Sequence, residues 1–150
     1  MLGLRFCYLI MASMKLRIII KGILMNHIRI LLVDDEVRYL KTIAKLLKRE
    51  GFTVTTALNG IEALHVLDQK TFDIAVLDMM MPGMDGLGVL KAIKQQYPLM
   101  EVIVLTGHAT VESAVEGLKL GACDYLVKPV DVNELISRIR YVHAKYEQSR

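Results

Sequence analysis

The amino-acid sequence predicts an α/β fold, with a doubly wound, five-stranded parallel sheet and helices on both of its faces. Short apolar runs alternate with amphipathic segments along the chain, several of the runs stop at a polar residue, and turn-forming residues separate the segments. A return to a parallel strand needs a crossover, which is usually a helix and takes the right hand. Among the doubly wound sheets, we expect the flavodoxin-like strand order 2-1-3-4-5.

Five segments are expected to be strands, because each is a short apolar or β-branched run. They are residues 28–33, 53–58, 74–77, 101–105 and 124–127. The third run is unbroken and stops at Asp78, which suits a parallel strand that is covered by helices on both faces.

Five helices are expected, one after each strand, from apolar residues that recur at helical spacing. Asn59, Asp85 and Asp131 are suited to cap three of them, because their side-chain oxygens can accept bonds from the first backbone N–H groups. The residues expected to face the sheet include Ile61, Leu64 and Leu67 in the second helix and Ala114, Val115 and Leu118 in the fourth.

The composition predicts a protein with a packed core, and the positive charge is unevenly distributed along the chain. The chain has 150 residues, 53% of them hydrophobic and 23% charged, which predicts one domain with an ample core. The formal charge is +3, but residues 1–25 hold four of the 19 basic residues and none of the 16 acidic ones. Residues 26–150 therefore carry a net charge of −1, and we expect no direct binding of nucleic acid.

Residues 1–25 form an apolar leader that we expect to lie outside the functional domain, which spans residues 26–150. Its longest uncharged run, Phe6 to Met14, is far shorter than the ~20 residues of a membrane span, so no membrane association is expected. Cys7 and Cys123 show no disulfide or metal spacing, which favours a reducing, cytoplasmic location over export. An upstream start codon explains the leader best, with an anchor or an extra strand as alternatives.

Polar side chains follow the predicted strands at their carboxyl ends. Asp34 and Asp35 follow the first strand, Asp78 the third, Thr106 the fourth and Lys128 the fifth, and these ends share one edge of the sheet. Clustered carboxylates repel one another unless a cation lies among them, and oxygen ligands favour Mg²⁺ over zinc. Because Thr106 and Lys128 can hold phosphate oxygens, the arrangement predicts a magnesium-dependent phosphoryl site at Asp78.

These strand ends resemble the response-regulator receiver domain of two-component signalling. The resemblance covers about Ile28 to Tyr146 and is carried by four segments: LLVDDE at 31–36, LDMMMPGMDG at 77–86, LTGH at 105–108 and DYLVKP at 124–129. The segment LTGHAT at residues 105–110 is similar to the corresponding segment in receivers of enhancer-binding transcription activators.

The resemblance implies that Asp78 accepts a phosphoryl group from a histidine kinase or a phosphotransfer protein. It further implies that Asp35, Asp78 and the backbone carbonyl of Met80 coordinate Mg²⁺, while Asp34 assists through water. The side chain of Met80, and that of His108 two residues after Thr106, would flank the path of a hydrolytic water. Met80 is expected to block this water, whereas His108 is either an ordinary loop residue or a modulator of the phosphate lifetime.

The same resemblance assigns roles to the remaining strand-end residues. Thr106 and Lys128 would hold the phosphoryl oxygens, and the peptide bond between Lys128 and Pro129 would be cis. Tyr125 would turn inward when the domain is phosphorylated, so that Thr106 and Tyr125 form the switch.

The expected function is a phosphorylation-activated switch that changes a partner-binding face. Apart from its own phosphorylation and slow dephosphorylation, we expect no enzymatic activity. The signal would pass to a downstream protein partner or to a C-terminal output domain, from a monomer or a phosphorylation-dependent dimer.

Two alternatives belong to other functional classes. A phosphotransferase of the haloacid-dehalogenase type would need an Asp-x-Asp loop, which neither residues 34–36 nor residues 78–80 supply. A binding module that never takes phosphate would not need the complete set of acids, hydroxyl and ammonium.

Overall fold

Five parallel strands form one sheet in the computed structural model, which describes residues 2–25, 27–83, 85–107 and 111–149. The strands are β1 (Arg29–Val33), β2 (Thr53–Ala57), β3 (Ile74–Asp78), β4 (Glu101–Thr106) and β5 (Asp124–Val127). Their order is β2-β1-β3-β4-β5, and every neighbouring pair is parallel. The predicted fold class and strand order are confirmed.

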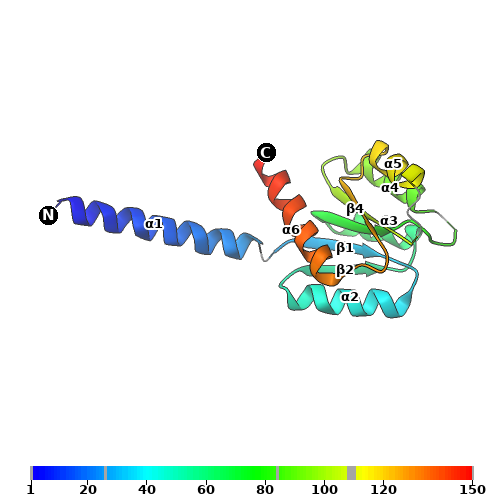
Figure 1. Ribbon diagram of the computed structural model, residues 1–150, viewed down its shortest axis with the longest axis horizontal. Helices are drawn as coiled ribbons and strands as arrows, with labels where there is room; N and C mark the ends of the chain where they lie inside the picture. The colour runs from blue at the N-terminus through cyan, green and yellow to red at the C-terminus, as the bar shows by residue number, and fades with distance from the viewer. Residues whose placement is uncertain (1, 26, 84, 108–110, 150) are drawn as a thin grey trace.

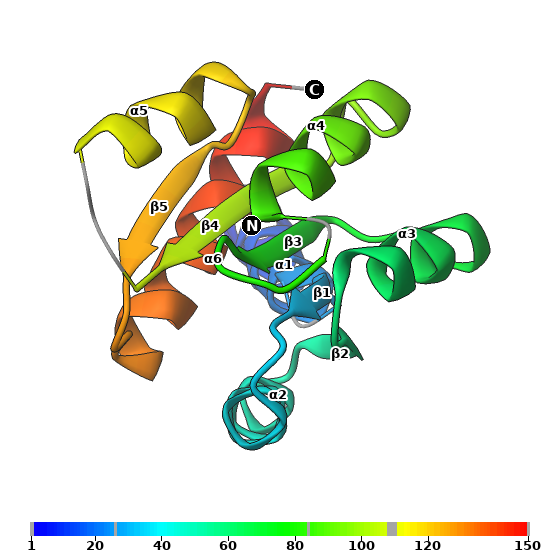
Figure 2. The same ribbon diagram turned by 90° about the vertical axis from the view of Figure 1, so that its right-hand side faces the viewer.

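Helices cover both faces of the sheet (Figure 1). Their bounds are α2 (Val37–Arg49), α3 (Gly60–Gln69), α4 (Gly86–Gln96), α5 (Val111–Lys119) and α6 (Val132–Gln148). Figure 2 looks along the sheet and shows α2 and α6 on one side and α3, α4 and α5 on the other. Each side has its own core, because alternate residues of β1, such as Leu31 and Leu32, point into different apolar clusters.

The capping predictions hold in the three helices concerned. The Asn59 side chain accepts a hydrogen bond from the backbone N–H of Glu62 at 2.8 Å, and Asp85 accepts one from Gly88 at 2.7 Å. Asp131 accepts from the N–H groups of two residues at the start of α6. These bonds satisfy donors that the first helical turn leaves without an intrahelical partner.

Three of the residues expected to face the sheet are exposed instead. Ile61 is 73% exposed, because Gly60, Ala63 and Leu67 form the buried stripe of α3 and Ile61 lies off that stripe. In α5, Val115 and Leu118 are 42% and 44% exposed. The side of α5 that meets the sheet has small residues instead, Ala114 and Gly117, so the larger apolar residues face outward.

Residues Leu2–Met25 form an additional helix, α1, which projects away from the sheet (Figure 1). The side chains of residues 3–20 are all exposed, although many of them are apolar. Among the helices that the structure describes, none has the length and the apolar run needed to cross a membrane.

The charge of the folded domain is unevenly distributed over its surface. Helix α2 contains five basic residues and no acidic one, and all five are exposed: Arg38, Lys41, Lys45, Lys48 and Arg49. The near-neutral total of residues 26–150 conceals this local positive surface, which a count of charges along the sequence does not reveal.

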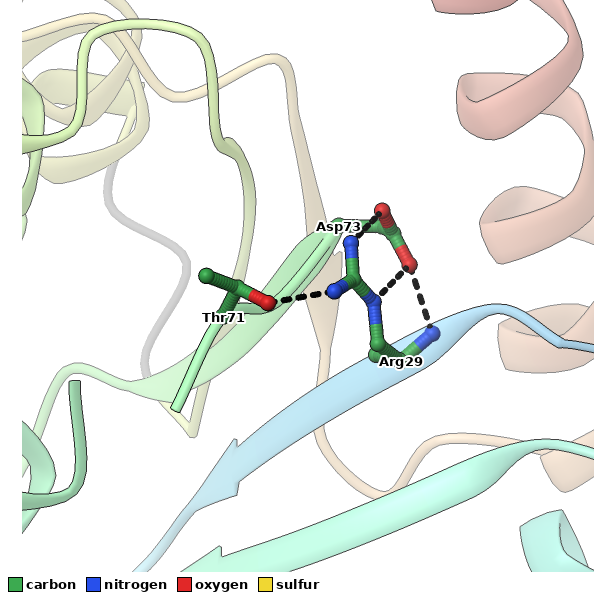
Figure 3. A network of polar contacts seen from close by, with 3 residues as sticks. All are labelled: Arg29, Thr71 and Asp73. Atoms are coloured by element: carbon green, nitrogen blue, oxygen red, sulfur yellow. Dashed lines mark hydrogen bonds and ion pairs between the residues drawn. The ribbon is translucent and has the colours of Figure 1, made fainter. Parts of the chain in front are cut away.

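A polar network fixes the amino ends of the central strands (Figure 3). The guanidinium and the backbone N–H of Arg29 donate to both carboxylate oxygens of Asp73, with N···O distances between 2.8 and 3.1 Å, and the guanidinium also donates to Thr71. In return, the backbone N–H of Asp73 donates to the carbonyl of Arg29 at 2.9 Å. The network holds the register of β1 against β3 at the edge of the sheet opposite the carboxyl ends.

Candidate functional site

The carboxyl ends of four neighbouring strands bring the predicted polar residues together. Asp34 follows β1, Asp78 ends β3, Thr106 ends β4 and Lys128 follows β5. Asp34, Asp78 and Thr106 are 0%, 3% and 5% exposed, and they are the buried polar or charged residues of the described core. Burying such groups is costly unless they are paired, so their collection at one sheet edge indicates a site for chemistry.

Three of these carboxylates form a compact acidic cluster. Oxygen atoms of Asp34, Asp35 and Asp78 all lie within 4.8 Å of one another, with Asp34 and Asp78 buried and Asp35 exposed. Hard oxygen ligands at this spacing fit a divalent cation such as Mg²⁺, and the exposed Asp35 leaves the cluster open to solvent. The donor set therefore agrees with the metal that the sequence predicts.

Asp34 already has partners for both of its carboxylate oxygens. Its Oδ1 accepts a bond from the backbone N–H of Glu36 at 2.8 Å, and its Oδ2 lies 2.5 Å from the Lys128 ammonium. These contacts are compatible with the expectation that Asp34 assists a metal ion through water, since its oxygens are occupied by the protein.

Lys128 connects the two buried acids. Its ammonium lies 2.5 Å from Asp34 and 3.5 Å from Oδ2 of Asp78. Burial opposes its charge, but the hydrogen bond to Asp34 and the nearby charge of Asp78 raise the pKa of Lys128 above its ordinary value. The ammonium is therefore held charged beside Asp78.

Asp78 lies in an environment that disfavours its negative charge. Burial raises the pKa of its carboxyl, the charges of Asp34 and Asp35 raise it further, and the backbone N–H of Met80 and the Lys128 ammonium only partly oppose them. The N–H of Met80 donates to Oδ1 of Asp78 at 3.2 Å. A cation at the cluster would relieve the repulsion, which again fits the chemistry of the donor set.

Thr106 and Tyr125 lie on the neighbouring strands β4 and β5. Thr106 is buried, whereas Tyr125 is 40% exposed. A cavity of only about 10 Å³ lies between β4 and α5, with both residues in its lining. The peptide bond between Lys128 and Pro129 is cis, as the resemblance implies.

A glycine lets the next helix approach the site closely. A Cβ atom at Gly86 would lie 2.5 Å from Cα of Met79 and 2.7 Å from the carbonyl oxygen of Asp78. Only glycine fits here without a shift of the backbone that carries Asp78.

One residue of the site does not follow from the strand-end pattern. The ring of Tyr39, in the first turn of α2, lies under the Lys128 ammonium, which is 4.6 Å from the ring centroid. Asp35 precedes α2, so no helical spacing connects it with Tyr39, and the sequence gives no local signal for this contact. His108, which the sequence left as either an ordinary loop residue or a modulator of the phosphate lifetime, lies outside the described residues.

A comparison with sequence models of known families identifies the family of this chain. The sequence model of the response regulator receiver domain matches residues 30–140. The chain belongs to this family. Receiver domains act in general as phosphorylation-activated switches, and membership favours this prediction over the phosphotransferase and the phosphate-independent module.

Individual relatives show that this receiver domain is similar in sequence to response regulators of the NtrX and NtrC kinds. It is 45% identical over 114 residues to a putative NtrX-like response regulator of Rickettsia bellii, covering 75% of this chain and 24% of that protein. It is 39% identical over 118 residues to the DNA-binding transcriptional regulator NtrC of Escherichia coli, covering 79% and 25%. The chain thus spans about a quarter of the length of these relatives.

Solved receiver domains share its architecture. A CheY-like receiver domain protein from Methanospirillum hungatei is 32% identical with a TM-score of 0.79, covering 82% of this chain and 98% of that one. The receiver domain of NtrX from Brucella abortus is also 32% identical, with a TM-score of 0.70 and coverage of 81% and 99%.

Proposed function

We propose that Asp78 is the phosphoacceptor of this receiver domain and takes its phosphoryl group from the phosphohistidine of a histidine kinase or phosphotransfer protein. A carboxylate oxygen of Asp78 forms the new O–P bond while the N–P bond of the donor breaks and the histidine nitrogen keeps the bonding electrons. The observation that carries the proposal is the placement of Asp78 between the acidic cluster and the Lys128 ammonium.

The residues around Asp78 would share the charge of the phosphoryl group. Asp35, Asp78 and the carbonyl of Met80 would hold Mg²⁺, with Asp34 acting through water, and the bound ion would supply positive charge to the phosphoryl oxygens. Lys128 would exchange its contact with Asp78 for a phosphoryl oxygen. The Thr106 hydroxyl would donate a hydrogen bond to another phosphoryl oxygen. The only reactions of the site would be phosphorylation and slow dephosphorylation of the chain itself.

The switch would use the packing between β4, β5 and α5. The 10 Å³ cavity beside Thr106 and Tyr125 is far too small for an aromatic ring, so Tyr125 can turn inward only if Thr106 moves toward the phosphoryl group. Two discrete packings of this kind form a bistable element. Exposed apolar side chains beside it would form the changing face: Val115, Leu118, Tyr125 and Val127.

The proposed partners follow from the surfaces beside the site. The basic helix α2 begins next to the acidic cluster, so a phosphodonor protein that reaches Asp78 would meet a positive surface. The changing face would engage a downstream protein or a C-terminal output domain in the cytoplasm, from a monomer or a phosphorylation-dependent dimer.

Labelling with acetyl phosphate and Mg²⁺ tests the assignment of Asp78. We expect one acid-stable, base-labile phosphoryl group per chain, lost in Asp78→Asn and on removal of Mg²⁺. Asp85→Asn is the matched control, because Asn caps a helix as well as Asp does and Asp85 is exposed. Full labelling of Asp78→Asn would show that another residue is the acceptor.

A further inference from the structure

The Lys128 ammonium has an aromatic neighbour in addition to its two acids. Its nitrogen lies 2.5 Å from Asp34, 3.5 Å from Asp78 and 4.6 Å from the centre of the Tyr39 ring. A cation within about 6 Å of a ring centroid is attracted by the negative face of the ring. The Tyr39 ring is thus a third contact of the ammonium, and the Lys128 side chain is only 20% exposed.

The hydroxyl of Tyr39 gives no alternative reason for this placement. Its oxygen is buried and has no hydrogen-bond partner among the described residues. Buried polar groups nearly always have a partner, and leaving one without is unfavourable. Among the described residues, the contact of Tyr39 with the site is therefore made by the face of its ring and not by its hydroxyl.

We infer that Tyr39 is a positioning residue of the phosphorylation site, whose ring holds the Lys128 ammonium against Asp34 and Asp78 and in reach of an arriving phosphoryl group. Lysine is a flexible point charge, and without the ring only the two carboxylates hold the ammonium against the attraction of water. The inference rests on the proposed role of Asp78 and adds a residue from α2 to a site otherwise built from strand ends.

Three substitutions of Tyr39 separate the effect of the aromatic ring face from the effect of side-chain volume. Tyr39 also packs against the core beside α2, so loss of the ring alone could act through packing. Tyr39→Phe keeps the ring and removes the unpartnered hydroxyl, and it should label as fast as the wild type. Tyr39→Leu keeps much of the apolar volume without the ring face, and Tyr39→Met repeats this test with a more adaptable side chain.

A double-mutant cycle with Lys128→Met provides the decisive measurement. With acetyl phosphate and Mg²⁺, Tyr39→Leu should slow the initial labelling about fivefold, but less than twofold further when Lys128 is already Met. The cycle is repeated on the urea midpoints of the unphosphorylated protein. Tyr39→Leu should lower the midpoint by roughly 0.5 M with Lys128 present and by clearly less without it.

The outcomes distinguish this inference from the proposed function. If Tyr39→Leu and Tyr39→Met each slow labelling by the same factor with Lys128 present as with Lys128→Met, Tyr39 acts only through packing, and the inference is overturned. The inference would also be overturned if Tyr39→Phe were labelled as slowly as Tyr39→Leu. The same holds if Tyr39 and Lys128 are coupled in the urea midpoints but not in the labelling rates. The urea cycle does not require phosphorylation, so labelling of Asp78→Asn would refute the acceptor while the coupling of Tyr39 to Lys128 still stood.

Discussion

Met80 lies two residues after Asp78 and its side chain is 63% exposed, so it can be replaced without disturbing the core. A thioether forms no strong hydrogen bond to a water approaching the phosphorus, whereas an amide can orient that water. One such bond in the transition state, at about 1.4 kcal/mol, changes a rate tenfold. Met80→Asn should therefore shorten the half-life of the phosphorylated protein several-fold, with little change in its rate of formation.

Met80→Leu is the control for this prediction, because it stays apolar and should leave the half-life unchanged. The decay is followed after removal of acetyl phosphate. An unchanged or longer half-life for Met80→Asn would mean that water access past this residue does not limit the signal.

At the residue scale, the sequence predicted the strand-end residues but not Tyr39. Asp34, Asp78 and Lys128 could be placed because each follows an apolar run, and the topology of a parallel sheet brings such ends together. Tyr39 lies inside a helix, and its partner Lys128 is 89 positions away. A contact of this kind depends on how α2 packs against the sheet, which no local pattern encodes.

Asp73 gives a prediction for the pH dependence of stability. Burial opposes ionisation of its carboxyl, but the hydrogen bonds from the side chain and backbone of Arg29 prevail and lower the pKa of Asp73 below its ordinary value. A lowered folded-state pKa stabilises the protein above the unfolded pKa, about 3.9, and this contribution is lost as the pH falls through the folded value.

Asp73→Asn should accordingly cost about 1 kcal/mol at pH 7, a modest figure because Arg29 is partly exposed. In urea titrations from pH 7 to pH 3, the difference from the wild type should narrow below about pH 4. Glu50→Gln, which breaks an exposed pair with Arg140, should change stability by less than about 0.5 kcal/mol. If the difference in unfolding free energy between the wild type and Asp73→Asn is as large at pH 3 as at pH 7, ionisation of Asp73 is not its origin.

At the scale of elements, the position of α4 depends on one glycine. Because a Cβ at Gly86 would meet backbone atoms of both Asp78 and Met79, Gly86→Ala must displace the helix or the loop that carries the acceptor. We expect a loss of about 1–3 kcal/mol in unfolding free energy and slower labelling by acetyl phosphate.

Gly117→Ala is the opposite control. Gly117 lies in α5 and an added Cβ meets no atom within 4 Å, so this substitution should stabilise by about 0.5–1 kcal/mol, as alanine usually does in a helix. If Gly86→Ala also stabilises and labels normally, the close approach of α4 to Asp78 is not a requirement of the site.

Helix faces were harder to predict than helix bounds. Helix α4 begins at residue 86, directly after the predicted cap Asp85, and ends at residue 96, shortly before Pro98, so the capping and breaking residues in the sequence agree with its bounds. In α5 the apolar residues recur at helical spacing, but the sheet accepts the small Ala114 and Gly117 while Val115 and Leu118 are exposed. Hydrophobicity alone favours the larger residues and so gives the wrong face.

For the whole molecule, the doubly wound parallel sheet followed from the alternation of strands and helices and from the handedness of their crossovers, whereas the structure of the leader did not follow from any sequence pattern. Its basic residues, Arg5, Lys15, Arg17 and Lys21, interrupt the apolar run, and the sequence left an anchor or an extra strand as the alternatives to an upstream start codon. The observed α1 has no distinct polar and apolar faces, and its described side chains are exposed. Packing of the described side chains therefore does not account for α1.

The last prediction is that residues 1–24 contribute little to the stability or chemistry of the receiver domain. The side chains described between residues 3 and 20 are exposed, so their removal uncovers no core, and the site lies at the carboxyl ends of strands that begin at Arg29. A variant that begins at Met25 should melt within a few degrees of the longer chain and label equally fast with acetyl phosphate. Its sedimentation should also show less self-association, because exposed apolar surface promotes contact between copies. A fall of about 10 °C in Tm would correspond to several kcal/mol and would show that α1 packs on the domain in solution.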